Sequence, residues 1–397
     1  MSQFDAYWRA QVDQRLNDGL LRQRPLLQSK QGVEVTLDGQ PVLSFASNDY
    51  LGFAGDERLV KAAAIAAENY GVGGGASHLV VGHHLEHQCL EEELAAFTKR
   101  EKALVFSSGY MANLAVVSTL VGAGDGVFQD KLNHASLIDG GLLSGARFQR
   151  YLHNDANSLQ THVERFSQRN ADLSPRKLVV TDGVFSMDGD LADLCGIAKV
   201  CDEQHSMLVV DDAHGLGVLG DQGRGTLDYL GVTSEQVPVL IGTFGKAFGT
   251  AGAFVAGSAA LIDYLEQFAR PYIYTTSMPP MLAAATRQSL ALIRAADDRR
   301  ERLQRNIDYF REGVLSLSLE LMESNTAIQP ILIGDSAVAM SVASMLRANG
   351  ILVGAIRPPT VPNNTARLRI TICSEHSLEM LDRLIDALSQ AKFECGL

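Results

Sequence analysis

The chain has 397 residues, 46% of them hydrophobic and 20% charged, which are the proportions of an ordinary globular protein. This length exceeds what one compact core accommodates and fits two domains. The formal net charge of −12 argues against a nucleic-acid-binding surface, and no apolar stretch of about 18 residues predicts a membrane-spanning helix.

Residues 1–45 predict an amphipathic helical arm that leads into a short hairpin, Val33–Leu43. The opening stretch mixes both charge signs and lacks the apolar core of a signal peptide, so we expect no secretion signal. The five cysteines are scattered and none is spaced C-x-x-C, so we expect reduced thiols in a cytoplasmic protein.

Residues 46–285 predict a large α/β domain with a mainly parallel sheet, because short apolar runs alternate with helical patterns. The runs are almost continuously apolar, as expected where helices cover both faces of a sheet. Helices are expected at Met111–Val121 and Asn157–Gln168. The expected strands are Ala103–Ser107, Val127–Asp130, Lys177–Thr181, Met207–Asp211, Val237–Gly242 and Gly252–Ala256.

Residues 286–397 predict a smaller C-terminal α/β domain. Just before it, Pro279–Pro280 marks the start of a long amphipathic helix that runs from Met281 towards Leu317. The remaining elements expected here are strands near Ile328–Ile333, Leu352–Ile356 and Arg367–Ile372, and helices near Ala337–Asn349 and Leu378–Ala391.

One lysine, Lys246 in the segment GTFGKAFG, lies among small residues just after an apolar strand. Glycines allow a ligand to approach the backbone closely. Desolvation would favour the neutral amine that a nucleophilic lysine needs. Taken alone, such a lysine is more often structural.

A second motif, VVDDAHG, places Asp211 and His214 at the end of another buried strand. A carboxylate there can pair with the protonated pyridine nitrogen of pyridoxal phosphate (PLP), and the histidine can bond the phenolic oxygen. A capping turn would explain one aspartate. Two capping turns explain much less well why D-x-x-H follows one strand and T-x-x-K follows the next.

Three further segments join a strand to a helix and fit the same pocket. In FSSGYMAN, Gly109 opens a helix whose first N–H groups can bind a phosphate. His134 in LNHAS could stack on the ring, and Ser186 in TDGVFSMDGD could donate a hydrogen bond to it. A lone histidine is usually structural, so these assignments depend on the whole set.

Seven motifs occur in the order seen in the α-oxoamine synthases: SNDYLG, LNHASL, TDGVFSMDGD, VDDAHGLGVLG, TFGKAFG, YTTSMPP and AIRPPTVP. From about Leu20 to Leu388 the chain resembles this family of fold-type I PLP enzymes, and its biotin-pathway branch most closely. The resemblance implies a large PLP-binding domain with a mainly parallel sheet and a smaller C-terminal α/β domain.

The resemblance also implies the cofactor contacts. Lys246 would carry PLP, with Asp211 at the ring nitrogen and His214 at the phenolic oxygen. His134 would stack on the ring with Ser186 beside it. The other contacts that it implies are Ser108, Gly109, Tyr110, Thr243 and Thr276. The last resembles a threonine that reaches the phosphate from a second subunit, which implies a homodimer with the site at the subunit interface.

For the substrates, Arg369 matches the arginine that holds the amino acid's carboxylate, a task that suits a planar guanidinium. Its neighbour Arg367 is expected to be a surface or structural charge. Arg22, Arg357 and Thr360 match positions near the acyl substrate. Glycine-using members of the family typically lack an arginine at position 357, and a pimeloyl thioester ends in a carboxylate that an arginine can bind.

The activity that the resemblance implies is a decarboxylative condensation of L-alanine with a pimeloyl thioester in biotin biosynthesis. The acyl group would be carried on coenzyme A or on a carrier protein. A sibling synthase that uses glycine or serine is the alternative. A silent PLP-fold protein fits less well because Lys246, Asp211, His214 and His134 are all present. A nicotinamide enzyme would rest on GLGVLG alone, and no helix follows those glycines.

Histidines between positions 78 and 87 raise the question of a metal site. His83, His84 and His87 have helical spacing, but a polar helix start explains them better, since no carboxylate or cysteine completes a ligand pattern. We therefore expect no metal. By the resemblance, His78 stands where several relatives carry arginine or glycine, in a loop expected near the acyl or cofactor channel.

Overall fold

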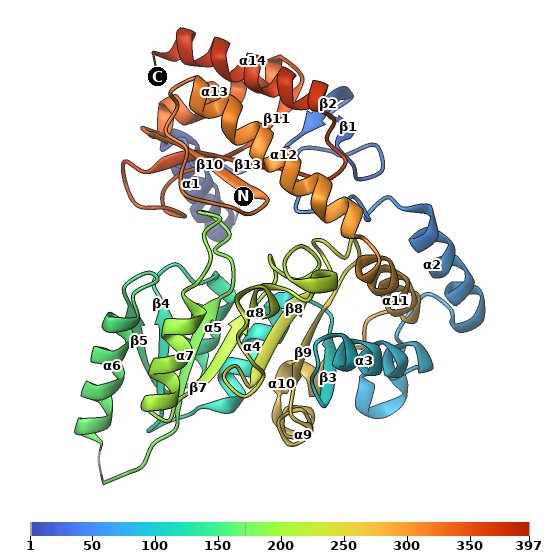
Figure 1. Ribbon diagram of the computed structural model, residues 1–397, viewed down its shortest axis with the longest axis vertical. Helices are drawn as coiled ribbons and strands as arrows, with labels where there is room; N and C mark the ends of the chain where they lie inside the picture. Colours follow the sequence, from blue (N-terminus) through green and yellow to red (C-terminus); the bar gives the residue numbers. More distant parts are fainter. Residues whose placement is uncertain (1, 171, 397) are drawn as a thin grey trace.

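The computed structural model describes residues 2–170 and 172–396, and a seven-stranded sheet forms the centre of its lower half (Figure 1). The strand order is β3–β9–β8–β7–β6–β4–β5. Because β9 pairs antiparallel with both β8 and β3 and the other pairs are parallel, β9 alone runs against the other six strands of this sheet. The strands are β3 (Lys102–Phe106), β4 (Gly126–Asp130), β5 (Arg147–Tyr151), β6 (Lys177–Asp182), β7 (Met207–Asp211), β8 (Val239–Thr243) and β9 (Ala253–Gly257).

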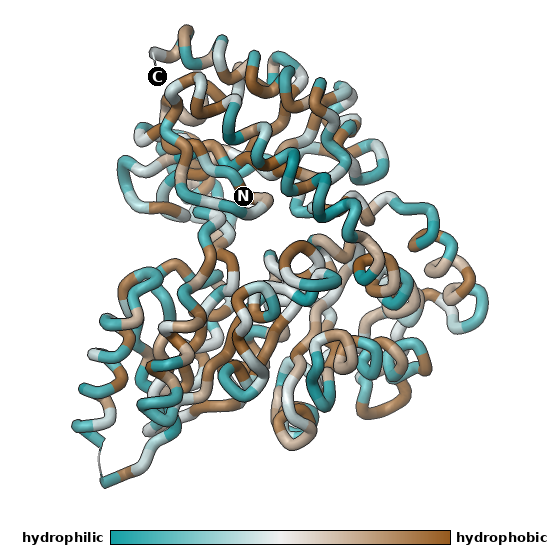
Figure 2. The backbone as a smooth tube through the Cα atoms, in the orientation of Figure 1, coloured by the Kyte–Doolittle hydropathy of each residue, from teal (hydrophilic) through white to brown (hydrophobic). Residues whose placement is uncertain are grey.

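Helices cover both faces of this sheet, which confirms the predicted α/β fold. One face carries α4 (Gly109–Leu120), α5 (Ala135–Leu143), α9 (Ala259–Phe268) and α10 (Arg270–Ile273). The other carries α6 (Ala156–Arg169), α7 (Leu194–Glu203) and α8 (Thr226–Leu230). The inner strands β6, β7 and β8 are largely hydrophobic, as the tube in Figure 2 shows, because both of their faces are buried.

The long helix expected from Met281 towards Leu317 is two helices, α11 (Pro280–Arg294) and α12 (Asp297–Ser316). They have different partners: α11 packs against α2 (Glu57–Tyr70) and α3 (Leu85–Phe97), whereas α12 packs against α14 (Leu378–Cys395). Two aspartates in the first turn of α12 favour a new helix start there, because carboxylates stabilise a helix N-terminus.

The upper half of Figure 1 holds two three-stranded sheets. One contains β10 (Ile328–Gly334), β13 (Ala366–Thr371) and β12 (Gly354–Ile356), and α13 (Ser336–Ala348) and α14 pack here. The strand expected at Leu352–Ile356 is divided, because β11 (Ile351–Leu352) joins the other sheet. There it pairs in parallel with β2 (Gln40–Ser44), which forms the N-terminal hairpin with β1 (Glu34–Leu37). We propose domain bounds of 1–45, 46–285 and 286–397.

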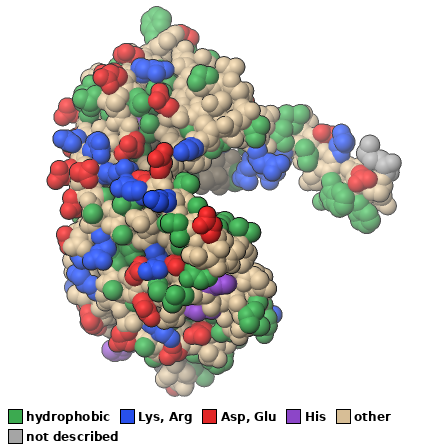
Figure 3. All heavy atoms as spheres, turned by 90° about the vertical axis from the view of Figure 1, so that its right-hand side faces the viewer, with side chains coloured by type: hydrophobic (Ala, Val, Ile, Leu, Met, Phe, Trp, Pro, Cys, Tyr) green, Lys and Arg blue, Asp and Glu red, His purple; other side chains and the backbone are tan. Residues whose placement is uncertain are grey.

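The first helix, α1 (Gln3–Asn17), stands away from the body of the molecule, and hydrophobic side chains gather towards its far end (Figure 3). It begins with a capping box formed by Ser2 and Asp5 and buries no residue. Within the part of the chain that the structure describes, no helix has the length and apolar character needed to cross a membrane.

Candidate active site

The parallel strands bring most of the predicted residues to one edge of the large sheet. His134 follows β4, Ser186 follows β6, Asp211 ends β7 and Lys246 follows β8. Since the carboxyl ends of parallel strands lie at the same edge, residues far apart in the sequence meet there.

The amine of Lys246 lies 2.7 Å from Nε2 of His214. On the other side of that imidazole ring, Nδ1 lies 2.5 Å from the hydroxyl of Tyr50. His214 is buried, and burial lowers its pKa well below the ordinary value. A neutral imidazole donates at one nitrogen and accepts at the other. His214 therefore connects the Tyr50 hydroxyl to the Lys246 amine and orients that amine.

A buried hydrogen-bond network holds Asp211. Asn113, one turn into α4, donates from Nδ2 to a carboxylate oxygen of Asp211 (2.7 Å) and lies 2.8 Å from the hydroxyl of Ser136. The backbone N–H of Ala213 donates to the other oxygen of Asp211 (3.0 Å). The Ser136 hydroxyl lies 2.7 Å from Nδ1 of His134. The network therefore fixes a carboxylate and an imidazole relative to each other.

Buried charges shift the ionisation of this cluster. Burial lowers the pKa of Lys246 to about 8, against the opposing pull of Asp211 and Asp182. Burial also raises the pKa of Asp182 well above its usual range, and the neighbouring Asp211 adds to that shift. The lowered pKa therefore makes the neutral amine of Lys246, the form that attacks an aldehyde, available at a lower pH than for an exposed lysine.

The start of α4 offers an anion site beside this cluster. Ser108 caps the helix by accepting from the N–H of Met111 (3.3 Å), and a Cβ at Gly109 would lie 3.7 Å from the hydroxyl oxygen of Thr243. Free N–H groups and hydroxyls at a helix N-terminus suit a phosphate. Tyr110 is 44% exposed and donates its hydroxyl proton to Asp139. Thr276 is exposed, and its carbonyl oxygen lies 3.5 Å from the hydroxyl of Ser107.

Arg369 reaches the cluster from β13 in the C-terminal part of the chain. Its guanidinium is buried and donates to three neutral oxygens: the carbonyl of Ser186 (2.6 Å), the hydroxyl of Thr371 (2.9 Å) and the side-chain oxygen of Asn48 (3.1 Å). Its charge therefore remains available to a substrate carboxylate. Arg367 is also buried and pairs with Asp188. Of the two positions expected for it, the structural one is therefore correct and the surface one is wrong.

Two of the three residues expected near the acyl substrate, Arg357 and Thr360, lie together away from the sheet edge. Arg22 and Thr360 are exposed. Arg357 donates to the carbonyl of Gly19, next to the end of α1, and its own carbonyl accepts from the N–H of Thr360 (3.1 Å). Within the part of the chain that the structure describes, the hydrogen bonds of Arg357 and Thr360 do not reach the Lys246 cluster.

A cavity of about 480 Å³ opens beside Lys246. The loop that follows β2 lines it with Ser47, Asn48 and Asp49, and the N-terminal hairpin contributes Val35 and Leu37. The hairpin therefore forms part of the wall of the candidate site, although its strands belong to a different sheet from the catalytic edge.

The sequence model of the aminotransferase class I and II family matches residues 40–388. An 8-amino-7-oxononanoate synthase of Pseudomonas paraeruginosa is 58% identical over 377 residues, which are 95% of this chain and 92% of that protein. One of Pseudomonas putida is also 58% identical, over 96% of both chains. The chain belongs to the 8-amino-7-oxononanoate synthase family. It is therefore a PLP-dependent acyltransferase that uses an amino acid and an acyl thioester.

Solved structures agree with membership of the 8-amino-7-oxononanoate synthase family. The Francisella tularensis member has a TM-score of 0.76 at 34% identity and covers 89% of this chain and 98% of its own. A serine palmitoyltransferase of S. paucimobilis with bound PLP has a TM-score of 0.93 at 30% identity over the whole of both chains. These matches confirm the fold-type I architecture.

The residues at the sheet edge fit PLP. A lysine with a depressed pKa, a buried carboxylate at a strand end and a helix start flanked by hydroxyls suit the aldehyde, ring nitrogen and phosphate of that cofactor. The sequence interpretation gave no role to Tyr50 or Asn113, although both contact the cluster. Their motifs, SNDYLG and FSSGYMAN, were recognised, but the contacts depend on partners far along the chain.

Proposed function

We propose that this protein condenses L-alanine with pimeloyl-CoA or a pimeloyl carrier protein to form 8-amino-7-oxononanoate, carbon dioxide and a free thiol. The observation that carries the proposal is the amine of Lys246, held 2.7 Å from a buried His214 at the same sheet edge as Asp211. Groups that hold one another in place in this way suit electrostatic preorganisation.

Each group at the sheet edge has a proposed task. Lys246 would bind PLP and later move the proton at the alanine Cα. Asp211 would keep the ring nitrogen protonated, His214 would bond the phenolic oxygen and His134 would stack on the ring, with Ser186 beside it. When bound, PLP supplies the electron sink for the carbanionic steps.

Cofactor contacts are also proposed at the start of α4 and around it. The backbone of Gly109 and the hydroxyls of Ser108 and Thr243 would hold the phosphate, and Tyr110 would lie beside the ring. The support for this assignment is the helix cap at Ser108 and the proximity of Gly109 to Thr243.

Arg369 would orient L-alanine by its carboxylate. A bidentate ion pair fixes the plane of the carboxylate, and with it the direction of the Cα–H bond. A carbon–carbon bond then forms between Cα and the thioester carbonyl as the thiol leaves. The bond from Cα to the alanine carboxylate breaks, releasing carbon dioxide, and a proton returns to Cα.

On the acyl side, we propose that Arg22, Arg357 and Thr360 bind the pimeloyl group, with Arg357 at its terminal carboxylate. The support is the fit between a guanidinium and a carboxylate. Arg357 and the N-terminal arm are already in contact through the carbonyl of Gly19.

We further propose that the protein acts as a homodimer in the cytoplasm, with Thr276 serving the phosphate of the partner's site. Large apolar side chains are exposed near the site and on α1, including Tyr274 (73%), Val81 (75%) and Phe4 (70%). Such exposure marks an interaction surface. The five cysteines are free, as suits a reducing compartment.

The absorbance spectrum of the purified PLP-loaded protein tests the proposal. The visible cofactor band should shift on addition of L-alanine and change again when pimeloyl-CoA follows, with stoichiometric release of thiol. Glycine or serine should give a much smaller shift. A preference for either would keep the family but overturn the proposed substrate, and the absence of a visible band would overturn the role of Lys246.

A further inference from the structure

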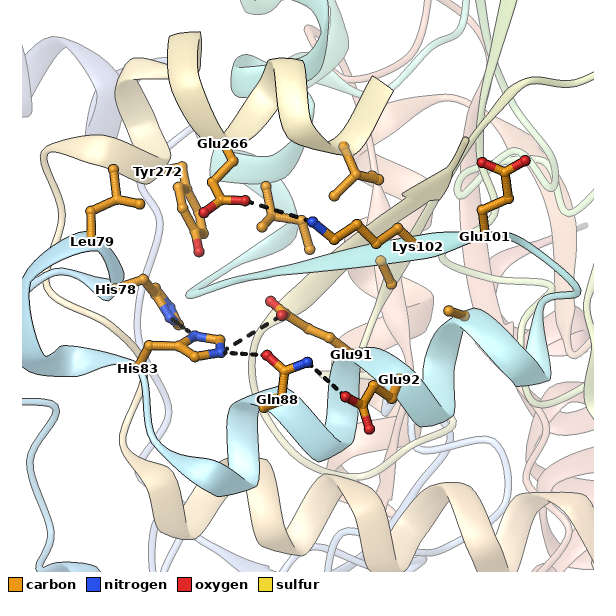
Figure 4. Close-up of a pocket in the computed structure, with 14 residues that line it drawn as sticks. His78, Leu79, His83, Gln88, Glu91, Glu92, Glu101, Lys102, Glu266 and Tyr272 are labelled. Atoms are coloured by element: carbon orange, nitrogen blue, oxygen red, sulfur yellow. Dashed lines mark hydrogen bonds and ion pairs between the residues drawn. The ribbon is translucent and has the colours of Figure 1, made fainter. Parts of the chain in front are cut away.

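A second pocket lies away from the Lys246 cluster, between α3, β3 and α9 (Figure 4). It has a volume of about 350 Å³ and is lined by polar side chains that include His78, His83, Gln88 and Glu91. A further histidine, His87, lies one turn before Glu91 on α3, close to His78 and His83. The proposed condensation uses none of these residues.

Three imidazoles from the single segment 78–87 converge beside this pocket. His78 belongs to the π-helical turn η1 (His78–Gly82), His83 follows it, and His87 lies in the first turn of α3. Nδ1 of His78 lies 2.9 Å from Nδ1 of His83. One nitrogen from each of the three rings lies within 4.8 Å of the other two.

The hydrogen bonds at the outer edges of two rings set which nitrogen faces inward. Nε2 of His87 donates to the carbonyl of Met278 (2.8 Å). Nε2 of His83 lies 3.3 Å from the side-chain oxygen of Gln88 and 3.9 Å from a carboxylate oxygen of Glu91. Metal-binding histidines characteristically donate their outer N–H to a carbonyl or carboxylate in this manner.

We propose that His78, His83 and His87 bind one divalent transition-metal ion of the Zn²⁺ class, with water from the pocket as the fourth ligand. Two nitrogens bound tetrahedrally to Zn²⁺ at about 2.05 Å lie roughly 3.3 Å apart. The Nδ1 atoms of His78 and His83 therefore need to separate by only a few tenths of an ångström. The ion also replaces the N–H of His84, which now donates to Nδ1 of His87 (3.0 Å).

The electrostatics of the pocket agree with this geometry. His78 and His87 are buried, and burial favours the neutral imidazole that binds a metal ion. Burial also raises the pKa of Glu91 to about 8. At neutral pH the Glu91 side chain is therefore mostly protonated, and a nearby dication would favour its ionised form.

Helical spacing in the sequence pointed to His83, His84 and His87, whereas in the structure His78 takes the place of His84 in the group. A second group of potential ligands in the described residues, His153, Asp188 and Asp190, is already satisfied internally. His153 lies 3.0 Å from both Asp130 and Asp190, and Asp188 pairs with Arg367. The pocket beside His83 also holds a cation, Lys102, but its amine pairs with the carboxylates of Asp263 (2.6 Å) and Glu266 (3.9 Å).

Titration of the PLP-loaded, chelator-treated protein with ZnCl₂ tests the proposal. We expect one high-affinity ion per chain by calorimetry and a rise of several degrees in the unfolding temperature at saturating Zn²⁺. His83→Gln should weaken binding at least tenfold and abolish the thermal shift. His84→Gln is the matched control, since it removes the adjacent imidazole and should leave both values unchanged.

Co²⁺ provides a test that needs no variant. Added to the wild-type protein, it should give the intense visible difference bands of a four-coordinate site with nitrogen ligands. Weak bands typical of six-coordinate Co²⁺, wild-type affinity in His83→Gln, or equal loss in His84→Gln would each overturn the assignment. Because turnover is not the readout, these results are independent of the proposed condensation.

Discussion

The region around Lys246 and the region around Arg357 differ in how far a single chain completes them. Around Lys246, side chains of α4 and α5 and of the segments where β4, β7 and β8 end already hold one another through hydrogen bonds. In the other region, Arg22 and Thr360 are exposed, and half-buried Arg357 donates to the backbone of the N-terminal arm. Reaction chemistry thus rests on the rigid sheet, while acyl recognition rests on peripheral segments whose arrangement we expect dimerisation to complete.

The largest expected effect is that of removing the amine. In Lys246→Ala the proton at Cα has no carrier, so we expect kcat to fall at least about 10³-fold. The visible band of covalently bound PLP should disappear as well. Circular dichroism that matches the wild type would show that the fold is retained, and residual turnover within tenfold of the wild type would contradict the assignment.

The next effect concerns Arg369. Lys cannot reproduce its three hydrogen bonds and a bidentate carboxylate contact, so in Arg369→Lys we expect KM for L-alanine to rise about 50-fold. KM for the thioester should change little. Steady-state kinetics with each substrate varied in turn separates the two, and an equal rise in both constants would argue for general distortion of the site.

The pH dependence of covalent PLP capture tests the buried environment of Lys246. Because burial lowers the pKa of Lys246 to about 8, its neutral fraction increases up to that pH and then levels off. We expect the rate at which cofactor-free protein captures PLP covalently to rise about tenfold from pH 7 to pH 9 and to plateau above. Stopped-flow absorbance measures this rate. A rise that continues beyond pH 10 would indicate an ordinary exposed lysine.

The smallest expected effect is that of removing the guanidinium of Arg357. In Arg357→Ala we expect KM for pimeloyl-CoA to rise about fivefold, because an exposed ion pair contributes little free energy. KM for L-alanine and the spectral shift with L-alanine should be unchanged. An acyl substrate without the terminal carboxylate should bind the variant and the wild type equally, and a retained preference for pimeloyl-CoA would place its carboxylate elsewhere.

The meeting of Lys246, Asp211, His134 and Ser186 at one sheet edge could be predicted from the sequence, because one rule connects these residues to the fold. Each expected residue followed an apolar run, and parallel strands bring their carboxyl ends together. Strand β5 was not predicted, since its sequence RFQRY alternates polar residues at the edge of the sheet. The break at Ala295–Ala296 was missed because the amphipathic pattern continues through it, and only the packing partners of the two helices differ.

Contacts between distant segments were beyond the reach of sequence patterns. Nothing local to Tyr50 indicates that its hydroxyl meets His214, and nothing local to Asn113 indicates Asp211. The histidine trio illustrates the same limit. Helical spacing suggested His83, His84 and His87, whereas the π-helical turn before His83 directs His78 into the group.

The parallel pair between Leu43 and Ile351 has a consequence for how the protein is made. During synthesis the hairpin of β1 and β2 leaves the ribosome long before β11 exists. At about 5–20 residues per second, the open edge of β2 waits roughly 15–60 s for its partner. For that time it is an unprotected strand edge, the kind of surface that a chaperone shields. The wall of the catalytic cavity is thus among the first segments to be translated and among the last to be completed.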